Sequence, residues 1–174
     1  MAAKQKNLSS FDDRSMPEAY GMRIGVVVAN WNKEITGALL EGTVRTLEKQ
    51  GIDREDIIIQ WVPGSFELPQ AAAIMIDAML VDAVICLGCV IQGETRHFEF
   101  ISQAVARGCM NLAISTLTPV IFGVLTTDTY EQALERAGGK HGNKGDEAAV
   151  AAIQMVQMQN QIFPEPEDPD EPFL

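Results

Sequence analysis

A histidine follows several potential anion-binding residues in the stretch GCVIQGETRHFEF, residues 88–100. An apolar run precedes this stretch and a segment with helical periodicity follows it. Gly93, Glu94 and Thr95 are therefore expected at a helix start, where outward-pointing amides favour phosphate. His97 is expected one turn inside that helix, and histidine is the usual proton shuttle near neutral pH. A structural histidine is the alternative, but the preceding residues favour catalysis.

Polar loops also follow the other apolar runs, in NWNKEIT, PGSFELP and TDTYEQ. In α/β folds, ligands bind at the carboxyl ends of the strands, so these loops are expected to form one pocket. Trp31 is either a core aromatic or a stacking surface for a flat ring. Gly64 marks either a tight turn or a close backbone approach to a ligand. Ser65 either caps the next helix or, with Glu67, binds hydroxyl groups or the edge of a heterocycle.

The apolar runs are nearly continuous in valine, isoleucine and leucine, which is typical of parallel strands buried on both faces. These runs are residues 23–29, 57–62, 82–88 and 119–126. Helical periodicity fills the gaps between them. The expected helical segments are residues 35–47, with a stop at Gly51, 68–79, 98–112, 130–137 and 147–161. The alternation predicts a doubly wound α/β sandwich. The block GGKHGNKG is expected to be an inter-helix turn, or a turn that directs Lys144 at a ligand.

The 174 residues suffice for one domain, and the formal net charge is −11. We expect an N-terminal arm at residues 1–22, a domain at 23–161 and an acidic, proline-rich tail at 162–174. A net-acidic body argues against a nucleic-acid partner. No apolar run is long enough to span a bilayer, and the first residues do not resemble a secretory signal, so a cytoplasmic protein without a membrane partner is expected.

Three cysteines, Cys86, Cys89 and Cys109, cannot all pair within the chain. Cys86 and Cys89 form a C-x-x-C, but Cys86 lies in an expected strand and no further metal ligands accompany the pair. Buried thiols are therefore predicted. Familiar nucleotide-binding motifs, G-x-G-x-x-G and G-x-x-x-x-G-K-[ST], are missing from the expected positions.

The motifs WVPGSFELP, LGCVIQGETRHFEF and PVIFGVLTTDTYEQALERAGGKHGNKG, in this order, resemble those of lumazine synthases. The resemblance covers about residues 23–161. It implies a flavodoxin-like, three-layer α/β/α sandwich with a four-stranded parallel sheet. It also implies condensation of 5-amino-6-(D-ribitylamino)uracil with 3,4-dihydroxy-2-butanone 4-phosphate, the penultimate step of riboflavin biosynthesis. No metal or redox cofactor is expected.

The resemblance assigns roles to the pocket residues. Trp31, where the family often has phenylalanine, would stack on the pyrimidine ring. Ser65, Phe66 and Glu67 would hold the ribityl chain, and His97 would transfer protons. Backbone groups around three further residues would contact the uracil edge: Cys89, Val90 and Ile91.

The resemblance places the phosphate at Gly93, Glu94 and Thr95, joined by Arg136. Phe122 and Lys144 match positions near the ring, and Arg136 and Lys144 join His97 as catalytic residues. In this family the neighbouring subunit completes the pocket. No role is transferred to Arg96 or His141.

The resemblance also implies a homopentamer, and some members of the family pack twelve pentamers into an icosahedral 60-mer. The segment PEAYGM is expected to add a strand to the sheet of a neighbouring subunit, covering its edge. Two alternatives to an enzyme are a flavin- or lumazine-binding homologue and a structural shell subunit. Neither needs the phosphate-binding residues, so an enzyme acting on small molecules is favoured.

Overall fold

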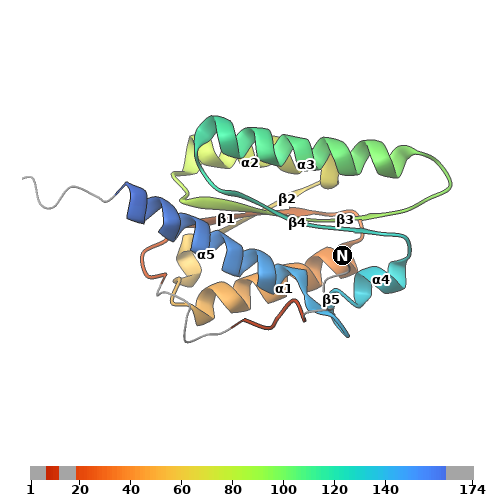
Figure 1. Ribbon diagram of the computed structural model, residues 1–174, viewed down its shortest axis with the longest axis horizontal. Coiled ribbons are helices and arrows are strands. Elements are labelled where there is room, and N and C mark those ends of the chain that lie inside the picture. Colours follow the sequence, from red (N-terminus) through yellow and green to blue (C-terminus); the bar gives the residue numbers. More distant parts are fainter. Residues whose placement is uncertain (1–6, 12–18, 164–174) are drawn as a thin grey trace, which may run out of the picture.

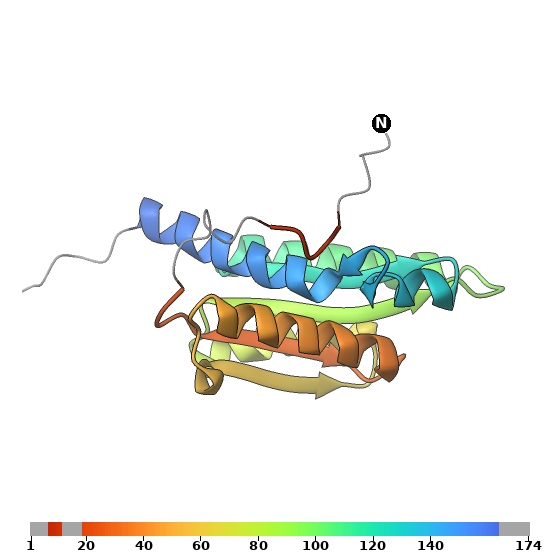
Figure 2. The same cartoon turned by 90° about the horizontal axis from the view of Figure 1, so that it is seen from below.

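The four apolar runs form a parallel sheet in the computed structural model, which describes residues 7–11 and 19–163 (Figures 1 and 2). Its strand order is β2-β1-β3-β4. The strands are β1 (Ile24–Ala29), β2 (Ile57–Val62), β3 (Ala83–Ile91) and β4 (Val120–Thr127). The predicted α/β sandwich with a four-stranded parallel sheet is therefore confirmed.

Helices cover both faces of the sheet and make it the middle of three layers. Helices α1 (Lys33–Lys49) and α5 (Lys144–Ile162) lie on one face, with the short α4 (Tyr130–Leu134) beside them (Figure 1). Helices α2 (Leu68–Met79) and α3 (His97–Thr116) lie on the other. Alternate β1 residues point to opposite faces, so both faces are buried and the strand is apolar throughout.

Short turns connect these elements. A 3₁₀ turn, η1 (Arg54–Asp56), precedes β2, and a second, η2 (Ser65–Glu67), joins β2 to α2. Helix α1 ends at Lys49, and the predicted stop residue Gly51 follows shortly after with a φ of +95°, in the left-handed region that favours glycine. No helix within residues 7–11 and 19–163 has both the length and the apolar character required to cross a membrane.

Strand β3 is longer than expected, because Cys89, Val90 and Ile91 continue its pairing with β4 as far as Thr127. The following residues then cross from the sheet to the α2–α3 layer before α3 begins. His97 is consequently the first residue of α3, and the expectation that it lies one turn inside the helix is wrong.

A two-stranded antiparallel hairpin, which the sequence analysis missed, begins at Ala137 and continues into the block GGKHGNKG. Its strands are β5 (Ala137–Gly139) and β6 (Gly142–Asn143), and α5 begins directly after it at Lys144. Helix α4 is correspondingly shorter than expected. Strands of two or three residues are too short to show alternation, which explains why periodicity did not reveal them.

The described parts of the N-terminal arm contact the domain. Residues 7–11 lie against the β5–β6 hairpin, and the Ala19 N–H donates to Gln50 O over 3.1 Å. Pro17 and Glu18 of the segment PEAYGM lie outside the described residues, as do residues 164–174 of the tail. Pairing of that segment with a neighbouring sheet stays a prediction, as do the domain boundaries.

Helices α1 and α5 approach most closely at Gly145. A Cβ atom there would lie 2.0 Å from Leu39 O and 2.7 Å from Thr43 Oγ1. Thr43 Oγ1 itself lies 3.0 Å from Leu39 O and 3.1 Å from Gly145 O, so backbone and hydroxyl groups fill the contact. A side chain at this position would force the helices apart.

We expect Gly145→Ala to lower the apparent melting temperature, because overpacking a close contact costs about 1–3 kcal/mol. Gly37→Ala is the matched control. Gly37 lies in α1 with no atom within 4 Å of a Cβ atom, and alanine favours a helix over glycine by about 1 kcal/mol. Thermal unfolding of both variants checks the contact. Equal melting temperatures for Gly145→Ala and the unaltered chain would contradict it.

Candidate active site

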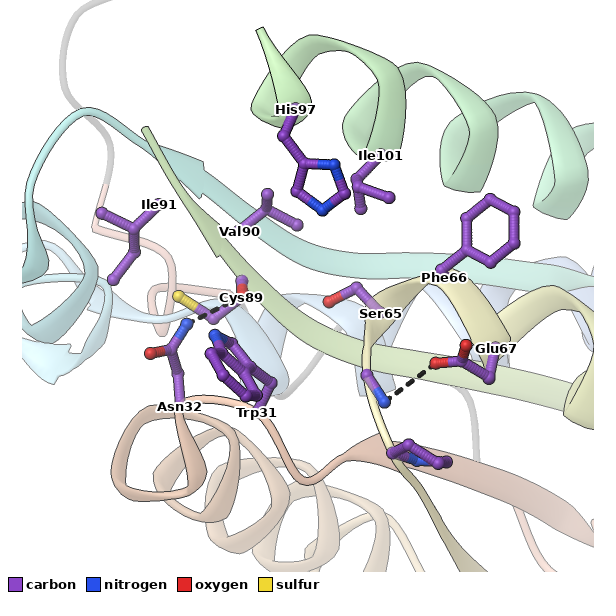
Figure 3. Close-up of a pocket in the computed structure, with 12 residues that line it drawn as sticks. Trp31, Asn32, Ser65, Phe66, Glu67, Cys89, Val90, Ile91, His97 and Ile101 are labelled. Atoms are coloured by element: carbon purple, nitrogen blue, oxygen red, sulfur yellow. Dashed lines mark hydrogen bonds between the residues drawn. The ribbon is translucent and has the colours of Figure 1, made fainter. Parts of the chain in front are cut away.

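A pocket of about 450 Å³ opens where β1, β2 and β3 end, beside the start of α3 (Figure 3). Its position at the carboxyl ends of the parallel strands agrees with the location expected from the sequence. The lining residues are Trp31, Asn32, Pro63, Gly64, Ser65, Phe66, Glu67, Cys89, Val90, Ile91, His97 and Ile101.

Two neighbouring strands hold Trp31 at the pocket. The Trp31 N–H donates to Pro63 O over 3.2 Å, so the chain beyond β1 stays beside the end of β2. The next residue, Asn32, adopts a left-handed conformation and its Nδ2 donates to Cys89 O over 3.0 Å. The Trp31 side chain is 72% exposed. It is therefore not a core aromatic, and its ring is accessible to a ligand.

The turn after β2 supplies the polar part of the pocket. The Gly64 N–H donates to Glu67 Oε2 over 3.0 Å, which fixes the carboxylate (Figure 3). Ser65 does not cap α2, contrary to one alternative from the sequence, because it lies in the turn η2 before that helix. Its Oγ is buried and has no hydrogen-bond partner among the described residues. A buried hydroxyl without a partner is uncommon, and a ligand hydroxyl would satisfy it.

Close packing against Gly88 fixes the position of Ser65. A Cβ atom at Gly88 would lie 2.6 Å from Ser65 Oγ and 2.9 Å from Leu68 Cδ1. The strand β3 therefore needs glycine at this point to let the turn approach.

His97 enters the pocket from the opposite side to Trp31 (Figure 3). Gly93, Glu94 and Thr95 precede it as exposed residues and do not themselves line the pocket. The His97 N–H meets Thr95 Oγ1 at 3.4 Å, which is long for such a hydrogen bond. An exposed loop thus lies directly before the histidine at the start of α3.

Arg136 and Lys144 lie together, but away from the pocket of their own chain. The Lys144 N–H donates to Arg136 O over 2.8 Å, which joins the two residues at the base of the β5–β6 hairpin. This hairpin lies on the α1–α5 side of the sheet, whereas α3 and its His97 lie on the other side (Figure 1). Lys144 Nζ donates to Glu147 Oε1, and Arg136 Nη1 donates to Gln132 O.

Phe122 is also absent from the lining, since it packs in β4 against the core beneath α2 and α3. Glu67 is the one carboxylate among the twelve lining residues, all of which lie in the described part of the chain, and none is lysine or arginine. The pocket of a single chain thus offers a stacking surface, hydroxyl-binding groups and an imidazole, but no permanent cation.

Sequence reasoning missed several pocket residues. Asn32 was visible beside Trp31 in NWN, and asparagine tolerates the left-handed conformation that it adopts here. Ile101 lies four residues after His97, on the same helix face. Outside the lining, the Tyr130 hydroxyl donates to Glu34 Oε2 and ties α4 to the start of α1. That hydrogen bond, followed by burial, raises the pKa of Tyr130 and keeps the phenol protonated.

The three cysteines are buried, free thiols, as predicted. Burial raises the pKa of the Cys89 thiol to about 11. A hydrogen bond with Cys109, followed by burial, raises the pKa of Cys86, and the same hydrogen bond lowers that of Cys109. Cys89 contributes its backbone carbonyl to the pocket framework, and its raised pKa favours the thiol over the thiolate at neutral pH.

Comparison with known proteins places these features in a family. The sequence profile described as 6,7-dimethyl-8-ribityllumazine synthase matches residues 21–160. A protein with that name from Parabacteroides distasonis is 52% identical over 156 residues, covering 90% of this chain and 98% of the relative. A Cytophaga hutchinsonii protein of the same name is 54% identical, with the same coverage. A Porphyromonas gingivalis relative, again so named, is 50% identical over 91% of this chain and 99% of its own.

We expect the thiols of the native protein to react slowly with a disulfide reagent such as DTNB at pH 8. Burial denies access, and Cys89 forms the reactive thiolate only as the pH approaches about 11. The unfolded protein in guanidinium chloride is the control, and it should release three equivalents rapidly. One equivalent released from the native protein at the unfolded rate would contradict the prediction.

Proposed function

The chain belongs to the 6,7-dimethyl-8-ribityllumazine synthase family, and on that premise we propose how its pocket performs the family's reaction. The reaction condenses 5-amino-6-(D-ribitylamino)uracil with 3,4-dihydroxy-2-butanone 4-phosphate and is a step of riboflavin biosynthesis. It yields 6,7-dimethyl-8-ribityllumazine, phosphate and water. The observation that carries the proposal is the convergence of an exposed Trp31 ring, an unpaired Ser65 hydroxyl and the His97 imidazole on one pocket.

The uracil substrate binds between Trp31 and the exposed edge of β3. Pairing of β3 with β1 ends at Leu87, whereas β3 itself continues to Ile91. The backbone groups of Val90 and Ile91 on that side are therefore placed to bind the polar edge of a pyrimidine, while Trp31 stacks on its face. This arrangement supports the assignment of Cys89, Val90 and Ile91 to the uracil edge.

The ribityl chain lies along the η2 turn. Its hydroxyls bind Ser65 Oγ, which lacks a partner in the described chain, and the Glu67 carboxylate held by the Gly64 N–H. Phe66, 58% exposed at the pocket rim, covers the chain from outside. These contacts replace hydrogen bonds that the polyol loses on leaving water.

His97 moves protons during the condensation. The uracil amine attacks the butanone ketone to form a carbinolamine, which loses water to give an imine. Elimination then releases phosphate, and ring closure with loss of a second water forms the lumazine. His97 reaches the pocket from the side facing Trp31, so an amine stacked there lies within its reach (Figure 3). Much of the acceleration comes from holding both substrates together.

The butanone phosphate binds at the start of α3 and needs a cation from outside the chain. Gly93, Glu94 and Thr95 offer backbone amides, but none of the described lysine and arginine residues lines the pocket. We propose that a neighbouring subunit supplies Arg136 to the phosphate, together with Phe122 and Lys144 near the ring. The exposure of Trp31 and Phe66 supports a subunit contact at this rim.

The proposed assembly is a homopentamer in the cytoplasm, in which each subunit completes the next one's pocket. We also propose packing of pentamers into an icosahedral 60-mer, because the compact GGKHGNKG block resembles that of the shell-forming members of the family. A binding protein without turnover is the less favoured hypothesis, since binding a flavin-like ring requires no phosphate site.

His97→Ala should lower kcat by about 100-fold while leaving turnover above the uncatalysed rate, because general acid–base catalysis contributes at least that much and substrate positioning survives. Lumazine fluorescence and free phosphate, followed together, measure it. Gln103→Ala, an exposed change in the same helix, should retain the normal rate. An unchanged kcat in His97→Ala, when chemistry limits turnover, would exclude the proton-transfer role. Ligand binding without product formation by the unaltered chain would favour the binding hypothesis.

Arg136→Ala should weaken butanone phosphate binding roughly 10- to 100-fold, the contribution of a charge-assisted hydrogen bond, and leave pyrimidine binding nearly unchanged. Titration calorimetry with each substrate separates the two effects. Lys140→Ala removes the same charge from the exposed turn of the hairpin and serves as the matched control. An equal loss of affinity for both ligands would count against the phosphate role.

Subunit mixing tests whether Arg136 acts across an interface. Co-expressed His97→Ala and Arg136→Ala chains should form some pockets with both residues intact, so the mixed assembly should exceed the summed activity of the separate variants. Activity equal to that sum would place Arg136 in the pocket of its own chain.

A further inference from the structure

Residues 7–11 lie across the β5–β6 hairpin and form what we call the N-terminal strap. The Leu8 N–H donates to His141 O over 2.8 Å, and the Asn143 N–H donates to Ser9 Oγ over 2.9 Å. Both views of the fold show this red segment beside the hairpin (Figures 1 and 2). The strap lies before residues 21–160, which the sequence profile of the family matches.

The strap has a local structure of its own. The Ser9 N–H donates to Asn7 Oδ1 over 2.9 Å, and the Ser10 N–H donates to Asn7 O over 3.0 Å, which closes a tight turn. Beyond the turn, Lys49 Nζ lies 5.8 Å from the centre of the Phe11 ring, so the strap also contacts α1. Ser9 is thus presented to the hairpin by a turn with defined hydrogen bonds.

The hairpin is shaped to receive this turn. At Gly142, a Cβ atom would lie 2.2 Å from Asn7 Oδ1 and 2.7 Å from Ser9 N. Any side chain at Gly142 would displace the strap, and its φ of +83° also favours glycine. The strap and the hairpin therefore meet backbone against backbone.

Asn143, the partner of Ser9, is held from three directions. Its N–H binds Ser9 Oγ, its Nδ2 donates to Ala38 O in α1 over 2.8 Å, and its Oδ1 accepts from the Gly145 N–H over 2.7 Å as the cap of α5. Two of these contacts come from the folded domain. The third comes from the strap alone.

The two proposed cationic residues depend on the position of Asn143. Lys144 follows it directly, and the Lys144 N–H donates to Arg136 O over 2.8 Å, while Ala137 pairs with Asn143 across the hairpin. We propose that Ser9 is a positioning residue: through the Asn143 amide it holds the hairpin in the orientation in which Arg136 and Lys144 meet the neighbouring pocket. This inference rests on the function proposed for those two residues.

Ser9→Ala in the full chain tests the proposal. Removing the acceptor should speed hydrogen exchange at the Asn143 amide and lower kcat/KM for 3,4-dihydroxy-2-butanone 4-phosphate, each by roughly two- to tenfold, the range expected for one neutral hydrogen bond. The kinetic change should fall mainly on KM for the phosphate substrate. Ser9→Thr, which keeps the hydroxyl, should restore both values. Ser10→Ala, at the adjacent exposed serine whose backbone rather than hydroxyl makes the turn, is the matched control.

The outcomes distinguish a positioning role of Ser9 from a purely structural role. Unchanged exchange at Asn143 in Ser9→Ala would overturn the contact. Faster exchange with normal kinetics would make the strap purely structural and overturn the positioning role. Arg136→Ala in the same assays separates the two proposals: if it is impaired while Ser9→Ala is normal, only the positioning role fails. If Arg136→Ala is itself normal, the function proposed for Arg136 fails, and the exchange result still tests the contact.

Discussion

The pocket depends on the unequal lengths of two neighbouring strands. Strand β3 pairs with β4 as far as Ile91, but its pairing with β1 ends at Leu87. The last residues of β3 therefore have backbone groups that face the place where β1 has already turned away. Asn32 binds one of these groups, the carbonyl of Cys89, and thereby brings Trp31 alongside the rest. A flat heterocycle with polar edges suits the remaining space, because it both stacks and pairs with the strand.

A second constraint acts on the opposite side of the sheet, where polar groups are buried between α1 and α5. Asp146 is 3% exposed, and its Oδ1 lies 3.1 Å from both Thr46 Oγ1 and Arg45 Nη2. Buried carboxylates need such partners, and the partners are directional, so the first turn of α5 has one position on α1. Gly145 permits the close approach, and Asn143 caps the helix in the same region. This rigid first turn carries Lys144.

The sequence predicts the sheet well because strands buried on both faces appear as continuous apolar runs. An error of one or two residues in the bounds of a run does not change the predicted strand. The sequence also predicts the location of the pocket, because ligands of parallel α/β sheets bind at the carboxyl ends of the strands. The end of β3 was missed because Gly88 looks like a terminator; the structure uses it to admit Ser65 and Leu68. The β5–β6 hairpin was missed because its strands are shorter than any periodicity.

Side-chain placement around the pocket was less predictable. Serine is a common helix cap, so the residue type of Ser65 suggests a capping role. Only the three-dimensional path of the turn shows that its hydroxyl does not cap α2. The pocket position of Asn32 was also not predicted. Nor was the contact between Ser9 and Asn143, which lie 134 positions apart. Such contacts are set by tertiary packing, which local patterns do not encode.

The uncharged part of the pocket and the two cationic residues lie on opposite faces of the sheet, and this separation matters for the proposed catalysis. A single chain holds residues suited to an uncharged, aromatic polyol and to proton transfer, while its paired Arg136 and Lys144 lie across the sheet. The Arg136 side chain that we propose comes from a second subunit would offset the desolvation cost of a doubly charged phosphate, because no lysine or arginine of the described residues lines the pocket. In the proposed assembly, catalysis is coupled to subunit association, because the imidazole proposed to move protons belongs to one subunit and the charge proposed to stabilise the leaving group belongs to the next. The proposed role of the strap extends this coupling, because residues 7–11 contact the hairpin beside Lys144 rather than the pocket itself.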